Sequence, residues 1–343
     1  MNDLAKRIRP RVGFLGVGWI GRHRLRSMVD AGAVEVAAVS DFDRSAAMAA
    51  ASNIPGAEVV PSLQALLQLE LDGLVIATPT ALHAEQAIAA LEAGTAVFCQ
   101  KPLGQSAAET ARGIQVARSV DRLLAVDMSY RFVRGMTKIK ELIKAGEIGE
   151  VYAGDLVFHN AYGPDKAWYY DLELAGGGCV IDLGIHLIDL ALWMFEFPGV
   201  RNVSSRLFSQ GRPVAGNKKS LEDYAVTRLD LATGATLNIA CSWRLAAGRD
   251  AVIRASFFGT QGGLSVQNVA GSFYDFCAER FQGTSRQVLD QPPDSWGGRA
   301  AIAWAERLSR SRKYDSDIER ALAVAEVIDA IYGDNIASGK GNL

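Results

Sequence analysis

The sequence has few of the residues that mark disulfide, metal or nucleic-acid-binding proteins. Its 343 residues include only four cysteines and four histidines. The cysteines (Cys99, Cys179, Cys241 and Cys277) lie far apart, with no C-x-x-C pair. This spacing argues against a disulfide framework and against a zinc site. The formal net charge is −2 and no basic run is long, so nothing indicates nucleic acid as a partner.

Long apolar runs and targeting signals are also missing. No apolar run approaches the roughly 18–20 residues that cross a bilayer. The basic stretch 1–11 is followed by a short strand with glycines rather than by the apolar core of a secretory signal. We therefore expect a soluble, cytoplasmic protein without a membrane partner. At ~150 residues per domain, the length suggests about two domains.

The first part of the chain alternates apolar strands with helices, which predicts a doubly wound parallel sheet. Its first strand, 11–15, runs into Gly16-Val17-Gly18-Trp19-Ile20-Gly21 and then into a helix. Strand, G-x-G-x-x-G and helix form the dinucleotide fingerprint. Its first glycine permits a tight turn, the second admits a pyrophosphate, and the third lets the helix pack on the strand. The predicted cofactor contacts here are Gly16, Gly18, Trp19, Ile20 and Gly21.

A carboxylate follows the second predicted strand, 34–40. Asp41 stands 20 residues after Gly21, where an acid accepts hydrogen bonds from the adenosine ribose hydroxyls. The same charge repels a 2′-phosphate, which favours NAD. Arg44, three residues further on, weakens that repulsion, so NADP stays open as the alternative cofactor. A helix N-cap or an ordinary loop acid is the alternative role for Asp41.

Polar residues also follow the strands predicted at 73–77 and 96–99. Because ligands bind at the carboxyl ends of parallel strands, we expect cofactor contacts from the residues after them. These are Thr78, Pro79, Gln100 and Lys101. Lys101 is otherwise a solvated surface lysine. Thr80 is expected to cap the next helix. His83 is a further candidate cofactor contact, although a structural role in that helix is favoured.

The second part of the chain is predicted to be an α+β domain. Consecutive strands joined by short turns, from 151 to 267, indicate an open, mostly antiparallel sheet. We place the boundary between a Rossmann domain, 1–128, and a substrate-binding domain, 129–343. The last helix, predicted at 317–332, is a candidate to pack back near the first domain. The uncovered sheet face suggests a homodimer or homotetramer.

One predicted helix, starting at Cys179, is apolar almost all round. Asp182, His186 and Asp189 recur on it at i, i+4 and i+7, which places them on one face. Burying such groups without partners is costly. They therefore form either a structural pair in the core or part of a wet cleft, and the helix alone leaves both open.

Together these motifs resemble the Gfo/Idh/MocA family, which includes glucose–fructose oxidoreductase and inositol dehydrogenase. The resemblance rests on the fingerprint, Asp41, Lys101-Pro102, and Gly176-Gly177-Gly178 followed by Asp182-x-x-x-His186. It covers nearly the whole chain and includes the stretches 90–94 and 146–149. It implies an NAD(P)-dependent dehydrogenase or reductase of sugars, cyclitols or related polyols. One departure is Gln100, where the family's E-K-P motif has Glu.

The resemblance also implies the catalytic residues Lys101, Asp182 and His186. His186 is the expected general base, because imidazole titrates nearest to neutral pH. Asp182 would orient it or bind a neighbouring hydroxyl, and Lys101 would stabilise developing alkoxide charge. Asp189 is then expected to have a structural role in the core.

The same three residues are candidate substrate contacts, with Tyr130, Asn160 and Trp168 as weaker ones, each of which is otherwise a core or surface residue. We expect no metal. The alternative functions are an NAD-dependent glycosidase that uses transient oxidation and a non-catalytic regulator that binds nucleotide or sugar. The loop 158–175, which is expected to determine the substrate, contains no motif that identifies it.

Overall fold

The computed structural model describes residues 9–214 and 221–338. The chain divides into two compact units. Unit 1 contains the described residues up to Asp127 together with Gly298–Leu322, and unit 2 contains Met128–Gly297 and the described residues from Ala323 on. The segment Gly298–Leu322, which the sequence prediction assigns to the second domain, thus belongs to unit 1.

Unit 1 is built on a six-stranded sheet whose neighbouring strands are all parallel. Its strand order is β3-β2-β1-β4-β5-β6, which confirms the predicted doubly wound sheet. The strands are β1 (Arg11–Leu15), β2 (Glu35–Ser40), β3 (Glu58–Val59), β4 (Gly73–Ile76), β5 (Ala96–Cys99) and β6 (Leu124–Val126). The two-residue strand β3 was not predicted, because so short an edge strand carries no recognisable pattern.

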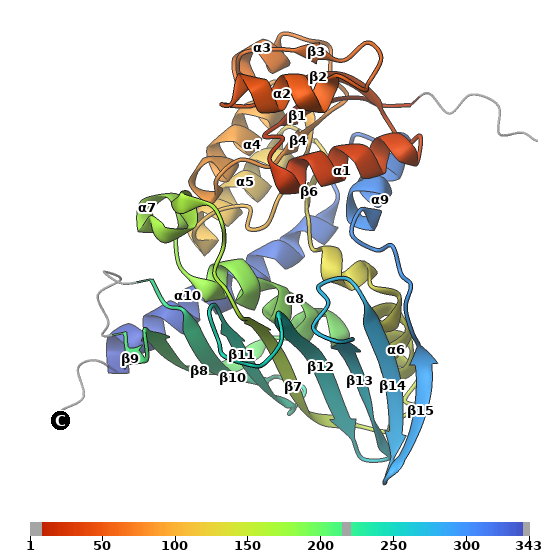
Figure 1. The fold of residues 1–343 in the computed structure, drawn as a ribbon, viewed down its shortest axis with the longest axis vertical. Helices are drawn as coiled ribbons and strands as arrows, with labels where there is room; N and C mark the ends of the chain where they lie inside the picture. Colours follow the sequence, from red (N-terminus) through yellow and green to blue (C-terminus); the bar gives the residue numbers. More distant parts are fainter. Residues whose placement is uncertain (1–8, 215–220, 339–343) are drawn as a thin grey trace, which may run out of the picture. The chain divides into compact units, whose positions relative to one another are not determined.

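Helices cover both faces of this sheet (Figure 1). They are α1 (Trp19–Asp30), α2 (Arg44–Ala51), α3 (Leu63–Leu67), α4 (His83–Glu92), α5 (Ala107–Ser119) and α9 (Arg299–Leu308), with the 3₁₀ turns η1 (Thr80–Leu82) and η5 (Ser316–Ile318). Alternate residues of β5 show the two faces. Phe98 packs against Trp304 of α9, with ring centroids 5.6 Å apart. Its neighbour Val97 belongs to the core formed with Leu91 of α4 and Ile114 of α5.

One predicted helix cap differs in the structure. Thr80 does not cap α4, because it lies inside η1 and no side chain caps either element. The cap of η5 is Asp315, which accepts a hydrogen bond from the N–H of Asp317. Ser106 caps α5 by accepting a hydrogen bond from the N–H of Glu109.

Unit 2 contains a nine-stranded sheet in the order β15-β14-β13-β12-β7-β11-β10-β8-β9. Its strands are β7 (Val151–Asn160), β8 (Val200–Ser209), β9 (Arg212–Pro213), β10 (Tyr224–Leu231), β11 (Thr236–Ser242), β12 (Ala251–Gly259), β13 (Gly262–Asn268), β14 (Phe276–Gln282) and β15 (Ser285–Asp290). Among these described strands, β7 and β11 pair in parallel and the other neighbours are antiparallel. This confirms the predicted, mostly antiparallel sheet.

Helices pack on one face of the large sheet (Figure 1). They are α6 (Arg134–Lys144), α8 (Ile185–Met194) and α10 (Glu319–Ser338), and the shorter elements of unit 2 are η2 (Ser129–Phe132), η3 (Ala167–Tyr170), α7 (Leu172–Ala175) and the π-helical turn η4 (Val180–Gly184). Helix α10 begins in unit 1, where Leu322 packs against the core, and continues in unit 2.

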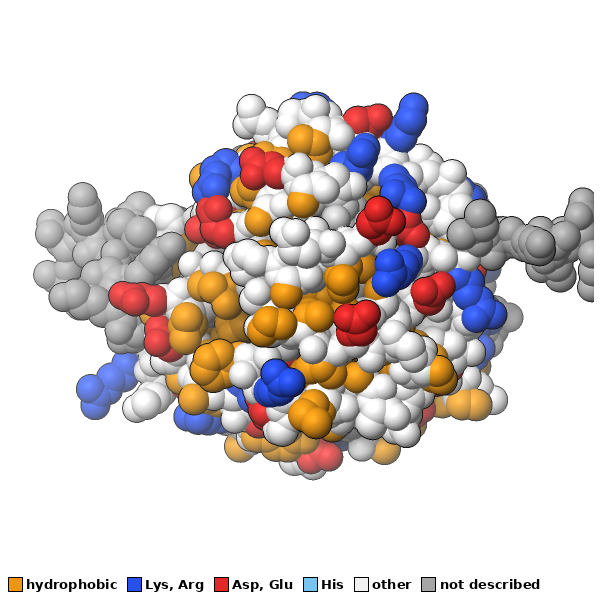
Figure 2. Space-filling view, turned by 90° about the horizontal axis from the view of Figure 1, so that it is seen from above, with side chains coloured by type: hydrophobic (Ala, Val, Ile, Leu, Met, Phe, Trp, Pro, Cys, Tyr) orange, Lys and Arg blue, Asp and Glu red, His pale blue; other side chains and the backbone are white. Residues whose placement is uncertain are grey.

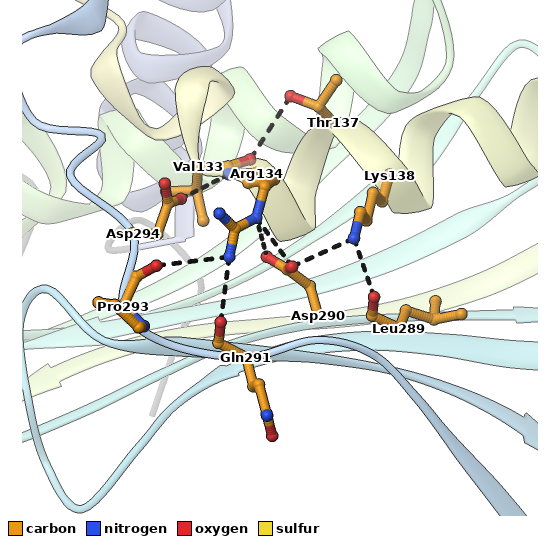
Figure 3. Close-up of polar contacts among 9 residues, drawn as sticks. All are labelled: Val133, Arg134, Thr137, Lys138, Leu289, Asp290, Gln291, Pro293 and Asp294. Atoms are coloured by element: carbon orange, nitrogen blue, oxygen red, sulfur yellow. Dashed lines mark hydrogen bonds and ion pairs between the residues drawn. The ribbon is translucent and has the colours of Figure 1, made fainter.

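Helix α6 is tied to the edge strand β15 by a charged cluster (Figure 3). The carboxylate of Asp290 accepts from Arg134 Nε at 2.8 Å and from Lys138 Nζ at 3.1 Å. Asp294 accepts the backbone N–H of Arg134 at 2.9 Å. These bonds satisfy a donor at the start of α6 and cover a sheet edge that would otherwise be open.

The helix that the sequence predicts from Cys179 begins as a π-helical turn, η4, and continues as α8. The stretch Leu172–Met194 is long and apolar enough to cross a membrane by length and composition. The expectation that no apolar run approaches that length is therefore wrong. However, 83% of its apolar window is buried inside the fold, as in a core helix.

The surface carries charges of both signs. Figure 2 shows a face on which Lys and Arg side chains are interspersed with Asp and Glu.

Candidate functional site

The fingerprint loop of unit 1 leaves room for an anion. Gly16 has a φ of +84°, and a Cβ on it would lie 2.5 Å from the carbonyl oxygen of Ala77. A Cβ on Gly21 would lie 2.1 Å from the carbonyl oxygen of Gly16. A Cβ on Gly18, in contrast, would meet no described atom within 4 Å, and no side chain caps the start of α1. Open space beside uncapped N–H groups suits a pyrophosphate.

Asp41 is fixed beside this loop. Its carboxylate accepts the backbone N–H of Val17 at 2.7 Å and that of Asp43 at 2.9 Å. The N-cap of α2 is Asp43, so Asp41 does not have the alternative role of a helix cap. Arg44 is exposed at the first residue of α2. These positions fit a carboxylate that receives ribose hydroxyls, a contact that stays a prediction.

The ends of β4 and β5 are joined by a buried histidine. His83 is 2% exposed, and its ring nitrogens lie 2.7 Å from the carbonyl oxygens of Pro102 and of Thr78. Burial lowers the pKa of His83. Because both nitrogens contact backbone, His83 has the structural role that the sequence favours. It fixes the loop that carries Lys101.

Gln100 belongs to a buried polar cluster that the sequence did not reveal. Its Nε2 donates to Asp127 Oδ2 at 2.5 Å, and the same oxygen accepts from Arg24 Nε at 2.5 Å. All three side chains are at most 7% exposed. Asp127 directly follows β6, so the strand-end rule that found Lys101 could have found it too.

The Gly176-Gly177-Gly178 motif allows close packing before the π-helical turn. A Cβ on Gly177 would lie 2.2 Å from the hydroxyl of Tyr332, and one on Gly178 would lie 2.0 Å from the carbonyl oxygen of Glu222. The buried carboxyl of Glu222 accepts from the N–H groups of Gly178 and Val180 at 2.9 and 3.0 Å. Burial raises the pKa of Glu222. Glu222 therefore fixes the start of the helix that carries Asp182.

The three polar residues of this helix have different surroundings. Asp182 accepts a hydrogen bond from Trp243 Nε1 at 3.0 Å. Asp189 is 1% exposed and forms a two-point ion pair with Arg131, whose Nε lies 2.8 Å from Oδ2. This pair is the structural role that the sequence predicts for Asp189.

The His186 ring packs against Tyr130, with centroids 4.8 Å apart. Tyr130 itself is 8% exposed and also contacts Phe158 and Trp296. The face of the imidazole is therefore held by aromatic rings. Tyr130 fits a residue that positions His186 better than one that is open to a substrate.

Aromatic residues of η3 connect to Trp243, which donates to Asp182. Trp168 stacks on Tyr169 at 3.8 Å, and Tyr169 meets Trp243 edge-on at 6.4 Å. Burial, and next the charge of Asp182, raises the pKa of the Tyr169 phenol. Asn160 ends β7, and its buried Oδ1 has no hydrogen-bond partner among the described residues. A sugar hydroxyl is a suitable donor to that oxygen.

The candidate residues thus form two groups. Unit 1 contains the fingerprint, Asp41, Thr78, Pro79, Gln100 and Lys101, and unit 2 contains Asp182, His186, Asn160 and Trp168. Trp243, Glu222 and Asp127, which hold these residues, were not predicted. The first group can bind a dinucleotide, and the second places an imidazole and a carboxylate four residues apart in one helical segment, the types of group that proton transfer needs.

Comparisons with known proteins assign both parts of the chain to one family. Residues 10–128 match the description "Oxidoreductase family, NAD-binding Rossmann fold", and residues 136–265 match "GFO/IDH/MocA C-terminal domain". The chain belongs to the Gfo/Idh/MocA family. It is an oxidoreductase, and unit 1 contains its NAD-binding Rossmann fold.

Named relatives share about a quarter of their residues with this chain over most of its length. D-glucoside 3-dehydrogenase of Escherichia coli K12 is 26% identical over 87% of this chain and 87% of its own length. Inositol 2-dehydrogenase of Mycolicibacterium smegmatis is 28% identical over 99% of this chain and 89% of its own. The crystal structure of GenD2 from gentamicin A biosynthesis, in complex with NAD, has a TM-score of 0.80 at 24% identity and covers 98% of this chain and 97% of that one.

Proposed function

We propose that this family member transfers a hydride between nicotinamide and the carbon of a secondary hydroxyl in a sugar, cyclitol or related polyol. The observation that supports it best is that Asp182 and His186 stand four residues apart in one helical segment, in a chain whose Rossmann domain carries Lys101 after a strand. The relatives named as glucoside and inositol dehydrogenases support the substrate class.

Each catalytic residue has a distinct task in this proposal. His186 takes the hydroxyl proton, and its ring is held by Tyr130 for that step. Asp182, fixed by Trp243, orients the imidazole or a neighbouring substrate hydroxyl. Lys101 donates to the reacting oxygen and stabilises the charge that develops there. The nicotinamide of a cofactor held by the Rossmann domain would supply the hydride acceptor.

Further parts of the proposal concern the cofactor, the assembly and the location. Asp41 supports NAD over NADP, since its charge opposes a 2′-phosphate. On β10, Ala225, Thr227 and Leu229 are buried, whereas Val226 is 40% exposed. This uncovered sheet face supports a homodimer or homotetramer. The four free thiols support a reducing compartment such as the cytoplasm.

Turnover measurements test the proposed function. We expect NADH to accumulate with at least one member of a panel of sugars, methyl glycosides and cyclitols, and we expect Lys101→Ala and His186→Ala each to lose most of this turnover at saturating NAD. The matched control is Lys313→Ala, at an exposed position of unit 1. Full activity in either site variant rejects the assignment. Glycoside cleavage without NADH accumulation would instead indicate the glycosidase chemistry.

A further inference from the structure

One cavity of unit 2 has Trp243 in its lining. It has a volume of about 580 Å³ and is lined by residues that include Tyr170, Asp171, Gln210, Asp223, Trp243 and Arg244. That volume falls within the roughly 300–1,000 Å³ typical of small-molecule sites. The Trp243 side chain connects this cavity to the catalytic group, because the residue lines the cavity while its Nε1 donates to Asp182 at 3.0 Å.

The aromatic side of the cavity is rigidly held. The hydroxyl of Tyr170 donates to the carbonyl oxygen of Pro164 at 2.9 Å, and its ring meets Trp243 edge-on at 5.8 Å. The Arg244 guanidinium lies over the same ring, 5.2 Å from its centroid, and Arg244 has a φ of +59° that side chains rarely adopt. Tyr170 nevertheless remains 42% exposed, so part of its ring is open to a ligand.

The polar side offers acceptors that are fixed but not saturated. One oxygen of Asp171 accepts from the N–H groups of Glu173 and Leu174, and one oxygen of Asp223 accepts from the N–H of Gln210. Within the described part of the chain, the second oxygen of each carboxylate has no hydrogen bond, and Arg244 has no ion pair. Two such acceptors and a planar donor match the adjacent hydroxyls of a sugar ring.

The charges of the cavity lining favour a neutral sugar ring over a phosphate as the occupant. Its two carboxylates outnumber its single guanidinium. A phosphate would therefore meet net repulsion, whereas a neutral, hydroxyl-rich ring would not. A flat aromatic side chain next to such polar groups suits a ring with one apolar face.

We propose that this cavity binds a second sugar ring, so that the substrate is a glycoside of at least two rings, with one ring oxidised beside Asp182 and the other bound at Tyr170. This inference rests on the proposed function. It predicts that an enzyme saturated with NAD discriminates between substrates that share the oxidised ring but differ in the group attached to it.

The test compares kcat/KM for methyl glycosides and for the corresponding disaccharides, with nucleoside diphosphate sugars as a third arm. We expect at least one disaccharide to exceed its methyl glycoside by roughly tenfold or more. Tyr170→Ala should bring this ratio close to one, and Arg244→Gln should lower it. The control Tyr152→Ala, at a tyrosine that is 57% exposed and lies outside the cavity lining, should keep the parent ratio.

Two results would overturn the second-ring site while leaving the dehydrogenase activity intact. One is a ratio near one in the parent for every pair, and the other is a preference for nucleoside diphosphate sugars. If no compound reduces NAD, the proposed function fails instead. Calorimetric titration then decides on the cavity. Tighter binding of a disaccharide than of its methyl glycoside, lost in Tyr170→Ala, supports it, and equal or undetectable binding rejects it.

Discussion

The buried cluster at Gln100 allows a sharp prediction about why this chain lacks the glutamate of the E-K-P motif. The amide of Gln100 donates to a carboxylate oxygen of Asp127 at 2.5 Å. In Gln100→Glu, two buried carboxylates would face each other, with Arg24 already paired with Asp127. Two such groups cannot both be charged, so one of them must hold a proton.

The size of the effect follows from that proton. Coulomb repulsion at ~4 Å costs about 4 kcal/mol at an effective dielectric constant of about 20. Keeping a proton on an acid with a pKa near 4.3 costs about 1.4 kcal/mol per pH unit, which is about 3.7 kcal/mol at pH 7 and about 1.6 kcal/mol at pH 5.5. Gln100→Glu should therefore lower the free energy of unfolding by about 3–4 kcal/mol at pH 7 and by less than half of that at pH 5.5.

Urea unfolding at the two pH values, followed by circular dichroism, measures this difference. The double variant with Asp127→Asn should recover most of the loss, because the new amide can donate to the new carboxylate. The control Gln64→Glu, at an exposed position of α3, should stay within about 0.5 kcal/mol of the parent. A Gln100→Glu variant that is as stable as the parent at pH 7, or equally destabilised at both pH values, would show that the new carboxylate and Asp127 do not repel each other in the buried cluster.

Three further predictions concern unit 2. Because the pKa of Glu222 is raised, its contribution to stability is present below its ordinary pKa of 4.5 and is lost as pH rises through the raised pKa. Glu222→Gln should therefore flatten the fall in melting temperature with rising pH. An unchanged melting profile would count against this prediction. Arg131→Met leaves Asp189 buried without its partner and should cost about 3–5 kcal/mol in chemical denaturation; a loss below about 1 kcal/mol would show that the pair is dispensable. Trp243→Phe removes the donor to Asp182 and should lower kcat roughly tenfold or more with an unchanged KM for NAD, whereas an unchanged kcat would exclude that positioning role.

The sequence predicts the fold of unit 1 better than that of unit 2. Strands such as β4 and β5 are buried on both faces, so they are short apolar runs that are easy to find. Strand β15 was missed because it is an edge strand whose residues are mostly exposed. The segment Gly298–Leu322 was assigned to the wrong part of the chain, because its return to unit 1 depends on contacts such as that between Trp304 and Phe98.

The candidate site shows the same limit. Lys101, Asp182 and His186 stand in local motifs, so they can be named without a structure. The residues that hold them come from distant segments: Trp243 lies 61 residues from Asp182, and Glu222 lies 44 residues from Gly178. The π-helical turn at Val180–Gly184 could not be predicted either, because this segment is apolar almost all round and so has no periodicity that distinguishes a wide turn from a regular one.

The proposed hydride transfer is tested most directly by following deuterium from the substrate carbon to nicotinamide. The purified chain would be incubated with NAD and with carbon-deuterated glucose, methyl glucoside, a disaccharide or myo-inositol, and the reduced cofactor would be analysed by mass spectrometry. We expect one deuterium per molecule of NADH formed with at least one of these compounds, and no label from deuterated water when the substrate is unlabelled. NADH that carries solvent deuterium at the transferred position, or no reduction of NAD by any of them, would contradict it.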